Sequence, residues 1–425
     1  MTKQSREFPQ TARASNVPII TGVVAVLATI GVGAYCGAVW VASRSAHVEP
    51  PRTVAAPLRT ADSVFLMTSQ HEARVTGGGS KWTAFRGLEK VTHVDVWRLD
   101  AKSARAVWRK RLFTEHEGNV VELGLLGVDD DRLWVFVRQP LLLSIEDGKV
   151  VADALAIAAR NASLKGAMPR HKRDYLFFEG HGLVFTAADA RPWLVDVQTL
   201  VSVPWQGRGP MQRETAIGPQ HFTPHTIGFQ KRGVTLSGRW IGVFREDEAN
   251  KPMVPDLLHA GPRPYRLWQA KAGGPLAVPY GWAKTPLPNM AMRARYSNFS
   301  VVEGSPEFFD AGLMSDGRSP VPLLLTAPDS VLILHRDRSH EAGRLRVTRI
   351  TAPGARVLWD VPLPLSSVHS VMPGKDDVVL FGRAHVPNRE RPGDRPSTAP
   401  EWLVHLNMED GAIRSFNVSA AALSR

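Results

Sequence analysis

Residues 125–137 read LLGVDDDRLWVFV, which is two short apolar runs joined by three consecutive aspartates. Leu, Val, Phe and Trp fill the runs, and aspartate is a residue that favours turns. Runs of this length bounded by a turn signal are typical of strands rather than of helices. The stretch therefore predicts a β-hairpin with the aspartates at its tip, and this hairpin chemistry is preferred over a calcium loop because alternating oxygen ligands are missing.

The same pattern recurs along the chain. Stretches that resemble the first one are expected to form inner hairpins, at 175–186, 234–244 and 370–381. Stretches with a polar turn, often closing on tryptophan, are expected to form outer hairpins, at 94–108, 141–151, 193–205, 345–359 and 402–416. One inner and one outer hairpin make a four-stranded unit of roughly 45 to 50 residues, the blade period of β-propellers. The sequence thus predicts an all-β propeller over 63–425, with about seven blades or eight.

Two stretches depart from the hairpin pattern, and a third is expected to complete a blade. Residues 152–164 are the one stretch with the composition of a short helix. Residues 206–322 are the least regular part, and 244–256 and 261–264 are interpreted as surface insertions between strands. The apolar run Ser63–Thr68 is expected to complete the blade formed by 402–418, since a propeller has edges where its first and last blades meet.

The repeated strand, acidic turn, glycine and closing tryptophan resemble the repeats of quinoprotein-type (PQQ-like) β-propellers and, more distantly, WD40 blades. That resemblance implies a propeller fold, and in the enzymes of that family it implies calcium-dependent quinone chemistry. Only the stretch with Gly354 and Trp359 has both the turn glycine and the following tryptophan. These enzymes also often place a vicinal disulfide against the quinone, whereas the sole cysteine of this chain is Cys36. No cofactor is therefore expected.

An apolar segment precedes the propeller. Val17–Ala42 reads VPIITGVVAVLATIGVGAYCGAVWVA and contains no charged residue or histidine. A helix of about 20 residues spans a bilayer, so the segment predicts one transmembrane helix. A short basic tail, 1–16, precedes it, and a proline-rich linker is expected over 43–62. The arrangement is typical of an uncleaved signal anchor in the cytoplasmic membrane, which would place the domain in the periplasm or outside the cell.

Charge and loop composition narrow the expected partners. The net charge is +12, but arginines are scattered rather than clustered, which argues against a nucleic-acid groove. An insertion at 386–396 is the predicted partner-binding loop, with its charged side chains at Arg389, Arg391, Asp394 and Arg395. His221 and His225 are interpreted as loop histidines, and Gly77–Lys81 as a flexible loop. No metal site is expected, and no catalytic residue can be assigned.

Two classes of function remain open. The favoured one is a binding or scaffold module that is anchored in the membrane and holds a protein or an envelope component. The alternative is a divergent propeller enzyme, either a quinoprotein-like oxidoreductase or a hydrolase or lyase, with its site at the central channel. Propeller enzymes can assemble paired carboxylates from distant blades, a pattern that sequence spacing does not reveal.

The signal-anchor interpretation makes a prediction about topology. Alkaline phosphatase fused after Arg425 should be active, because residues beyond Val48 are expected to lie outside the cytoplasm. The measurement is phosphatase activity in cells beside a matched fusion to a reporter that fluoresces only in the cytoplasm. An inactive phosphatase together with a fluorescent reporter would reverse the topology.

Overall fold

A computed structural model of the chain describes sixteen segments. They are residues 47–76, 87–116, 122–129, 131–164, 166–178, 181–207, 211–212, 233–236, 239–245, 264–272, 296–315, 324–326, 329–338, 343–351, 353–384 and 400–421. The chain divides into two compact units. Unit 1 comprises Met1–Val48 and Glu72–Val91, and unit 2 comprises Glu49–His71 and Thr92–Arg425. In unit 1, His47 and Val48 pair with Ala73 and Glu72.

Sheet 1 has three long strands and three very short ones. The long strands are β4 (Ser63–Thr76), β5 (Gly87–Asp100) and β6 (Ala106–His116), in the order β4-β5-β6. The short strands β1 (His47–Val48), β2 (Arg52–Thr53) and β3 (Leu58–Arg59) all pair with β4. Residues 47–62, which were expected to be part of a free linker, are therefore built into this sheet, and Ala55, Ala56 and Leu58 are buried.

Sheets 2 and 3 follow in the sequence. Sheet 2 consists of β7 (Leu123–Asp129), β8 (Arg132–Val137), β9 (Gln139–Ser144) and β10 (Val150–Asp153). Sheet 3 consists of β11 (Tyr175–Phe178), β12 (Gly182–Thr186), β13 (Pro192–Val195), β14 (Ser202–Pro204) and β15 (Met211–Gln212). Between the two sheets lie α2 (Ala154–Arg160), η1 (Ala162–Leu164) and η2 (Lys172–Asp174). The helix predicted at 152–164 is confirmed, and the Asp153 side chain caps its first turn by accepting from the Ala156 amide.

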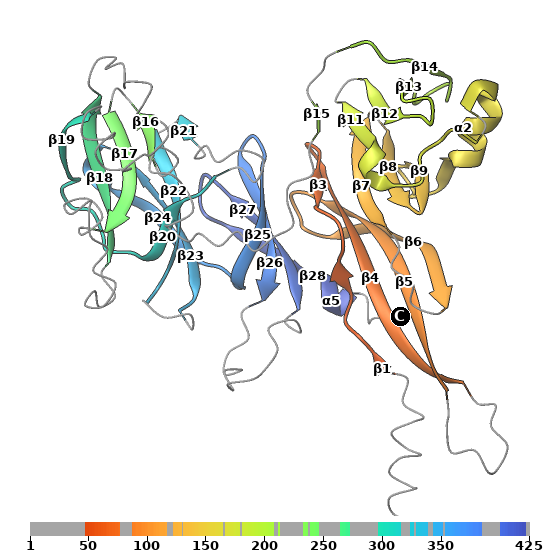
Figure 1. Ribbon diagram of the computed structural model, residues 1–425. Helices are drawn as coiled ribbons and strands as arrows, with labels where there is room; N and C mark the ends of the chain where they lie inside the picture. Colours follow the sequence, from red (N-terminus) through yellow and green to blue (C-terminus); the bar gives the residue numbers. More distant parts are fainter. Residues whose placement is uncertain are drawn as a thin grey trace, which may run out of the picture. The chain divides into compact units, whose positions relative to one another are not determined.

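Sheets 4, 5 and 6 complete the described chain (Figure 1). Sheet 4 consists of β16 (Gly233–Leu236), β17 (Arg239–Arg245), β18 (Tyr265–Ala272) and β19 (Tyr296–Val301). Sheet 5 consists of β20 (Phe309–Leu313), β21 (Leu324–Thr326), β22 (Asp329–Arg336), β23 (Leu345–Thr351) and β24 (Val357–Pro362), with η5 (Pro353–Ala355) in its last turn. Sheet 6 consists of β25 (Leu365–Pro373), β26 (Asp377–Ala384), β27 (Glu401–Asn407) and β28 (Ile413–Asn417), and α5 (Val418–Ala421) follows.

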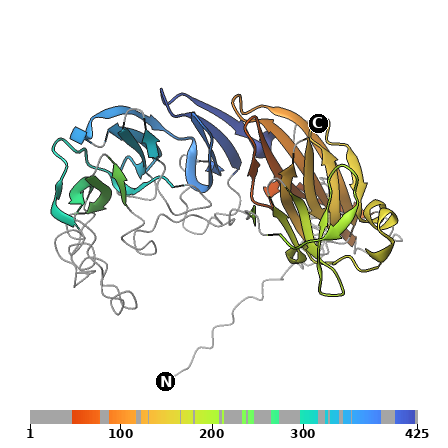
Figure 2. The same cartoon turned by 90° about the horizontal axis from the view of Figure 1, so that it is seen from above.

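The sheets pack face to face because their strands are apolar on both sides. In β4, Val64 and Leu66 point toward sheet 6, whereas Phe65 and Met67 point toward sheet 2. Five apolar clusters join the sheets in the succession 3, 2, 1, 6, 5 and 4. The blue strands of sheet 6 consequently lie beside the orange strands of sheet 1, although they are far apart in the sequence (Figure 2).

A second, directional contact repeats at two of these interfaces. Arg98 and Trp108 of sheet 1 both donate to the Ile145 carbonyl, in the last turn of sheet 2, at 3.0 and 2.7 Å. Arg349 and Trp359 of sheet 5 both donate to the Met408 carbonyl, in the last turn of sheet 6, at 2.6 and 3.2 Å. We call this paired donation the latch.

Each latch arginine is also oriented within its own sheet. The Arg98 Nε donates to Ser63 Oγ, and the Arg349 Nε donates to Ser330 Oγ, both at 2.9 Å. The latch therefore has the same four parts in both places: a serine, an arginine, a tryptophan and a carbonyl of the next sheet. Trp108 and Trp359 are closing tryptophans of the sequence pattern, and each donates to the next sheet beside the latch arginine.

The turn that receives the tryptophan requires a left-handed residue. Gly148 and Gly411 occupy this position with φ of 69° and 75°. Trp108 lies over Gly148 and Trp359 lies over Gly411, and a Cβ on Gly411 would come 2.9 Å from the Trp359 ring. At the corresponding turns of sheets 1, 3 and 5 the position is held by non-glycine residues with positive φ, namely Ala104, Leu200 and Ala355.

The structure confirms the nine predicted hairpins and corrects two expectations. Ser63–Thr68 does not complete the blade of 402–418: it is part of β4 in sheet 1 and only packs against sheet 6, which has four strands of its own. Residues 47–62 pair with β4 through three short strands instead of forming a linker. Of the insertions expected at 244–256 and 261–264, only residues 244, 245 and 264 are among the described residues.

The described residues are mostly β-strand and form several four-stranded antiparallel sheets, as expected for propeller blades. The blade number and the transmembrane helix are still predictions. Six sheets are present in the described residues, so the number of seven or eight blades stays a prediction. The apolar segment 17–42 lies outside the described residues, within which no helix combines the length and the apolar character needed to cross a membrane.

The latch turn predicts a difference between two glycine substitutions. Gly411→Ala and Gly354→Ala both place alanine at a positive φ, which costs about 1 to 2 kcal/mol. Gly354 has no neighbouring atom within 4 Å of the added Cβ, whereas Gly411 lies under Trp359. Gly411→Ala should therefore lower the free energy of unfolding by roughly 1 to 3 kcal/mol more than Gly354→Ala. Equal denaturation midpoints for the two variants would show that the tryptophan contact contributes nothing.

Candidate functional site

The interface between sheets 6 and 1 has the position of a latch but different residues. The β-ladders align Arg349 with Trp359 in sheet 5 and His405 with Arg414 in sheet 6. Ser330 pairs with Thr351, two residues beyond Arg349, and Asp377 pairs with Asn407, two residues beyond His405. At this interface the serine, arginine and tryptophan of the latch are thus replaced by Asp377, His405 and Arg414.

The replacement residues form a buried polar chain with an arginine from sheet 1. The Arg59 Nη2 donates to Asp377 Oδ1 at 2.5 Å, and its Nη1 donates to the Met372 carbonyl at 2.6 Å. His405 Nε2 lies 2.8 Å from Asp377 Oδ2. The side chains of Arg59, Asp377 and His405 are only 7%, 13% and 9% exposed. An unpaired charge buried this deeply would be strongly destabilising, and Arg59 and Asp377 avoid this by forming an ion pair.

The hydrogen bonds of this chain determine where the proton of His405 lies. An ionised carboxylate only accepts hydrogen bonds, so the Nε2 of His405 carries the proton that points at Asp377. Nδ1, the other ring nitrogen, is buried without a hydrogen-bond partner among the described residues. Gly374 allows the group to close up, because a Cβ there would collide with both Asp377 and Arg59.

A cavity of about 810 Å³ opens at this point, between sheet 6 and sheet 1. Arg59, Asp377, His405 and Met372 form part of its buried floor. Its exposed rim carries three acidic and three basic side chains, which are Asp62, Asp376, Asp410, Lys102, Lys375 and Arg414. The volume lies in the range of about 300 to 1,000 Å³ typical of ligand pockets. This cavity is the candidate functional site.

Two further polar contacts hold the walls of the interface together. The Thr53 amide in β2 donates to Glu401 Oε2 in β27 at 2.6 Å, and burial raises the pKa of Glu401 although these hydrogen bonds oppose the shift. The Arg414 Nη1 donates to the Lys102 carbonyl, in the turn between β5 and β6, at 3.2 Å. Arg414 thus reaches the turn of the next sheet as a latch tryptophan does, but from an exposed position.

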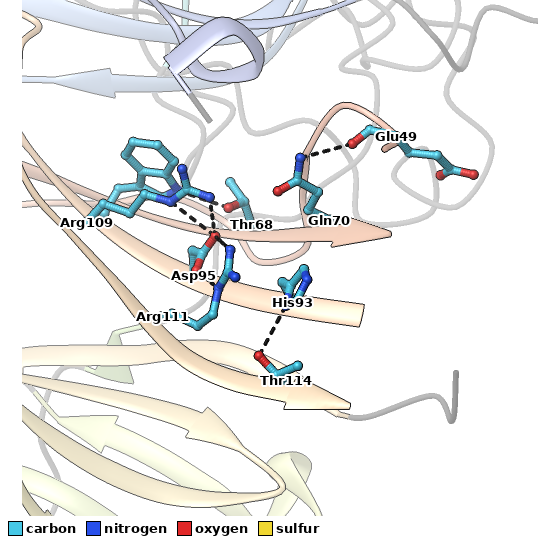
Figure 3. Close-up of polar contacts among 9 residues, drawn as sticks. Glu49, Thr68, Gln70, His93, Asp95, Arg109, Arg111 and Thr114 are labelled. Atoms are coloured by element: carbon cyan, nitrogen blue, oxygen red, sulfur yellow. Dashed lines mark hydrogen bonds and ion pairs between the residues drawn. The ribbon is translucent and has the colours of Figure 1, made fainter. Parts of the chain in front are cut away.

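A second buried polar cluster lies on the long strands of sheet 1 (Figure 3). Asp95, 1% exposed, accepts hydrogen bonds from Arg109 and Arg111, and the Arg109 guanidinium lies 4.6 Å from the centre of the Trp97 ring. Trp97 in turn donates to Thr68 Oγ1. Burial by itself raises the pKa of Asp95, but the hydrogen bonds and charges of Arg111 and Arg109 outweigh it, so the pKa lies below its ordinary value. Because the carboxylate engages both guanidinium groups, this cluster is interpreted as structural.

Most of the candidate residues singled out in the sequence lie outside the described residues. These are Arg389, Arg391, Asp394 and Arg395 of the predicted partner-binding loop, His221, His225 and the Gly77–Lys81 loop. Asp129 and Arg132 pair across the first hairpin, as its turn chemistry predicts. Within the described segments, no group of three or more His, Cys, Asp or Glu side chains could hold a metal ion.

Sequence reasoning missed the three polar residues of the cavity floor, Arg59, Asp377 and His405. Arg59 lies in the stretch taken for a linker, and 318 positions separate it from Asp377. The last outer hairpin, 402–416, ends on Arg414 and Phe416 without a closing tryptophan. The hairpin 141–151 lacks this tryptophan too, so its absence alone does not identify the site.

No known protein family and no curated protein matches the chain. Among solved structures, it is similar to the β-propeller domain of the trilobed protease from Pyrococcus furiosus, at 8% identity over 87% of this chain and 84% of that one, with a TM-score of 0.21. It is also similar to the computationally designed Ika8 protein, at 9% identity over 71% of this chain and 88% of that one, with a TM-score of 0.21. Similarities this weak carry no argument about function.

The Asp95 cluster makes a prediction about stability and pH. Asp95→Asn should lower the free energy of unfolding at pH 7 by about 2 to 4 kcal/mol, because two arginines lose a buried carboxylate. A carboxyl group with a lowered folded-state pKa stabilises fully above its unfolded value of about 3.9, and this contribution is lost as the pH falls through the folded value. The deficit of the variant should therefore shrink below about pH 4.

The matched control is Glu307→Gln, which removes a carboxylate that pairs with Arg266 where both side chains are about half exposed. Its loss should be about 1 kcal/mol or less, because solvent screens the pair. Urea denaturation at pH 7 and pH 3 measures both variants. A deficit of Asp95→Asn that is the same at the two pH values would contradict the proposed role of its charge.

Proposed function

We propose that this chain is a membrane-anchored, extracytoplasmic β-propeller that binds a protein partner, and that the partner enters the cavity between sheets 6 and 1. The all-β fold of repeated antiparallel sheets supports the propeller part of the proposal. The anchor is the apolar segment 17–42 and rests on its length and lack of charge.

The observation that carries the binding role is the replacement of a latch by a cavity. A latch fills its interface with a tryptophan and an arginine, and it stabilises the fold with two hydrogen bonds. The sheet 6 interface has lost both groups and has in their place a buried polar floor under a charged rim. The latch is present at two of the five described interfaces, so the cavity of about 810 Å³, and not the missing latch by itself, distinguishes this one.

The predicted loop at 386–396 remains a second place where a partner could make contact. It connects β26 to β27 and carries both acidic and basic side chains. The loop would add charge and reach to the binding surface, but the cavity is the part whose geometry is described.

Site-specific photo-crosslinking in cells tests the binding proposal. A photoreactive amino acid at Lys375, on the cavity rim, should give a discrete adduct with a partner protein. The same amino acid at Lys149, an exposed residue in the turn between β9 and β10 of sheet 2, is the control and should not give that adduct. A second variant that adds Arg414→Asp to the Lys375 probe should weaken the adduct at least about threefold, since it reverses one rim charge.

Two outcomes would count against the proposal. Identical adducts from Lys375 and Lys149 would show general contact with neighbouring proteins instead of a specific site. No adduct from Lys375, in cells where the full chain is membrane-inserted, would remove the cavity from the binding hypothesis.

A further inference from the structure

The rim charges of the cavity follow a regular arrangement. The turn between β25 and β26 presents Lys375 and Asp376, and the turn leading into β28 presents Asp410 and Arg414. The two turns of sheet 1 present Asp62 and Lys102. Each wall segment of the rim therefore offers one acidic and one basic side chain, and no ion pair joins these six to one another in the described chain.

The lining excludes several kinds of ligand by its chemistry. A polyanion such as a nucleic acid needs an excess of basic side chains, whereas this rim is balanced between acids and bases. Nucleobases bind by stacking on aromatic rings, and no Phe, Tyr or Trp is among the described residues that line the cavity. A purely apolar ligand would leave six charges to be desolvated without partners.

The floor of the cavity contributes less to ligand recognition than the rim. Asp377 and Arg59 satisfy each other, so neither is a strong attractor for a charged ligand group. His405 Nδ1 has no hydrogen-bond partner among the described residues, but it is buried below the accessible surface. The rim charges are therefore the groups that an occupant would contact.

We propose that the cavity binds a short polypeptide segment that carries acidic and basic side chains in alternation and that contacts the charged side chains of the rim. This inference rests on the proposed function and names the chemistry of the ligand. Opposite charges on the segment find opposite charges on every wall of the rim. Such complementarity selects the partner and fixes its register more than it adds affinity.

Fluorescence anisotropy with labelled synthetic peptides tests the ligand class. The probes are three octapeptides of equal length: alternating Lys and Glu, all Lys, and all Glu. The full chain in detergent micelles should bind the alternating peptide at least about fivefold more tightly than either homopolymer. Raising the salt concentration should weaken this binding, because the rim is exposed.

Two double variants separate the cavity from the rest of the surface. Lys375→Ala with Asp376→Ala removes one pair of rim charges and should weaken binding of the alternating peptide roughly fivefold. Lys149→Ala with Asp147→Ala removes an exposed ion pair from the turn between β9 and β10 of sheet 2, and should leave binding unchanged. All four substitutions lie in exposed turns, so thermal melting should show that both variants fold as the wild type does.

The results distinguish this inference from the proposed function. Equal binding of all three peptides, or undiminished binding by the Lys375 and Asp376 double variant, would overturn the ligand class. A specific adduct from Lys375 in the crosslinking experiment would nevertheless leave the cavity as a binding site, for a partner of other chemistry.

Discussion

The structure depends on sheets that are apolar on both faces and therefore cannot exist alone. Phe65 and Met67 need sheet 2, while Val64 and Leu66 on the same strand need sheet 6. Burial of a large apolar side chain contributes about 1.5 to 3 kcal/mol, so each face-to-face contact is the main source of stability for two sheets at once. Apolar contacts alone would allow neighbouring sheets to pack in several relative positions. The directional hydrogen bonds of the latch favour one of them.

The same dependence explains why a cavity could form at only a limited cost. At the interface of sheets 6 and 1, the apolar cluster around Leu66, Trp97 and Phe381 persists, and Thr53 with Glu401 adds a polar contact. The latch position at this interface is thus released from its structural role. Asp377 and His405 occupy it with groups that pair among themselves and leave open space above them.

The sequence predicted the hairpins because they are local. Turn residues and apolar runs lie within about ten residues of one another, so the period and the punctuation are visible directly. The short strands β1, β2 and β3 have two residues each, which is too few to show the alternation of apolar and polar residues typical of strands. The prolines between them favoured a linker. Their pairing with β4 is decided by burial of Ala55, Ala56 and Leu58, a tertiary effect.

The candidate site was beyond sequence reasoning for a related reason. Arg59, Asp377 and His405 come from three strands, and none of them stands in a motif that signals chemistry. Their meeting follows from the packing of the first sheet on the last, and the expected strand exchange between Ser63–Thr68 and 402–418 would have placed them differently. The last hairpin lacks the closing tryptophan, but so does the hairpin 141–151, so this feature does not locate the site.

The contact between the first and last sheets also sets an order in time. The residues joined by the Thr53 and Glu401 hydrogen bond are 348 positions apart. At a synthesis rate of about 5 to 20 residues per second, roughly 17 to 70 seconds pass between the appearance of one and of the other. Until the strands of sheet 6 have been synthesised, Val64, Leu66 and Trp97 lack the residues against which they pack in the folded protein. The nascent chain must therefore keep an apolar sheet face from aggregating until its own last strands arrive, so a chain that ends early would leave that face exposed.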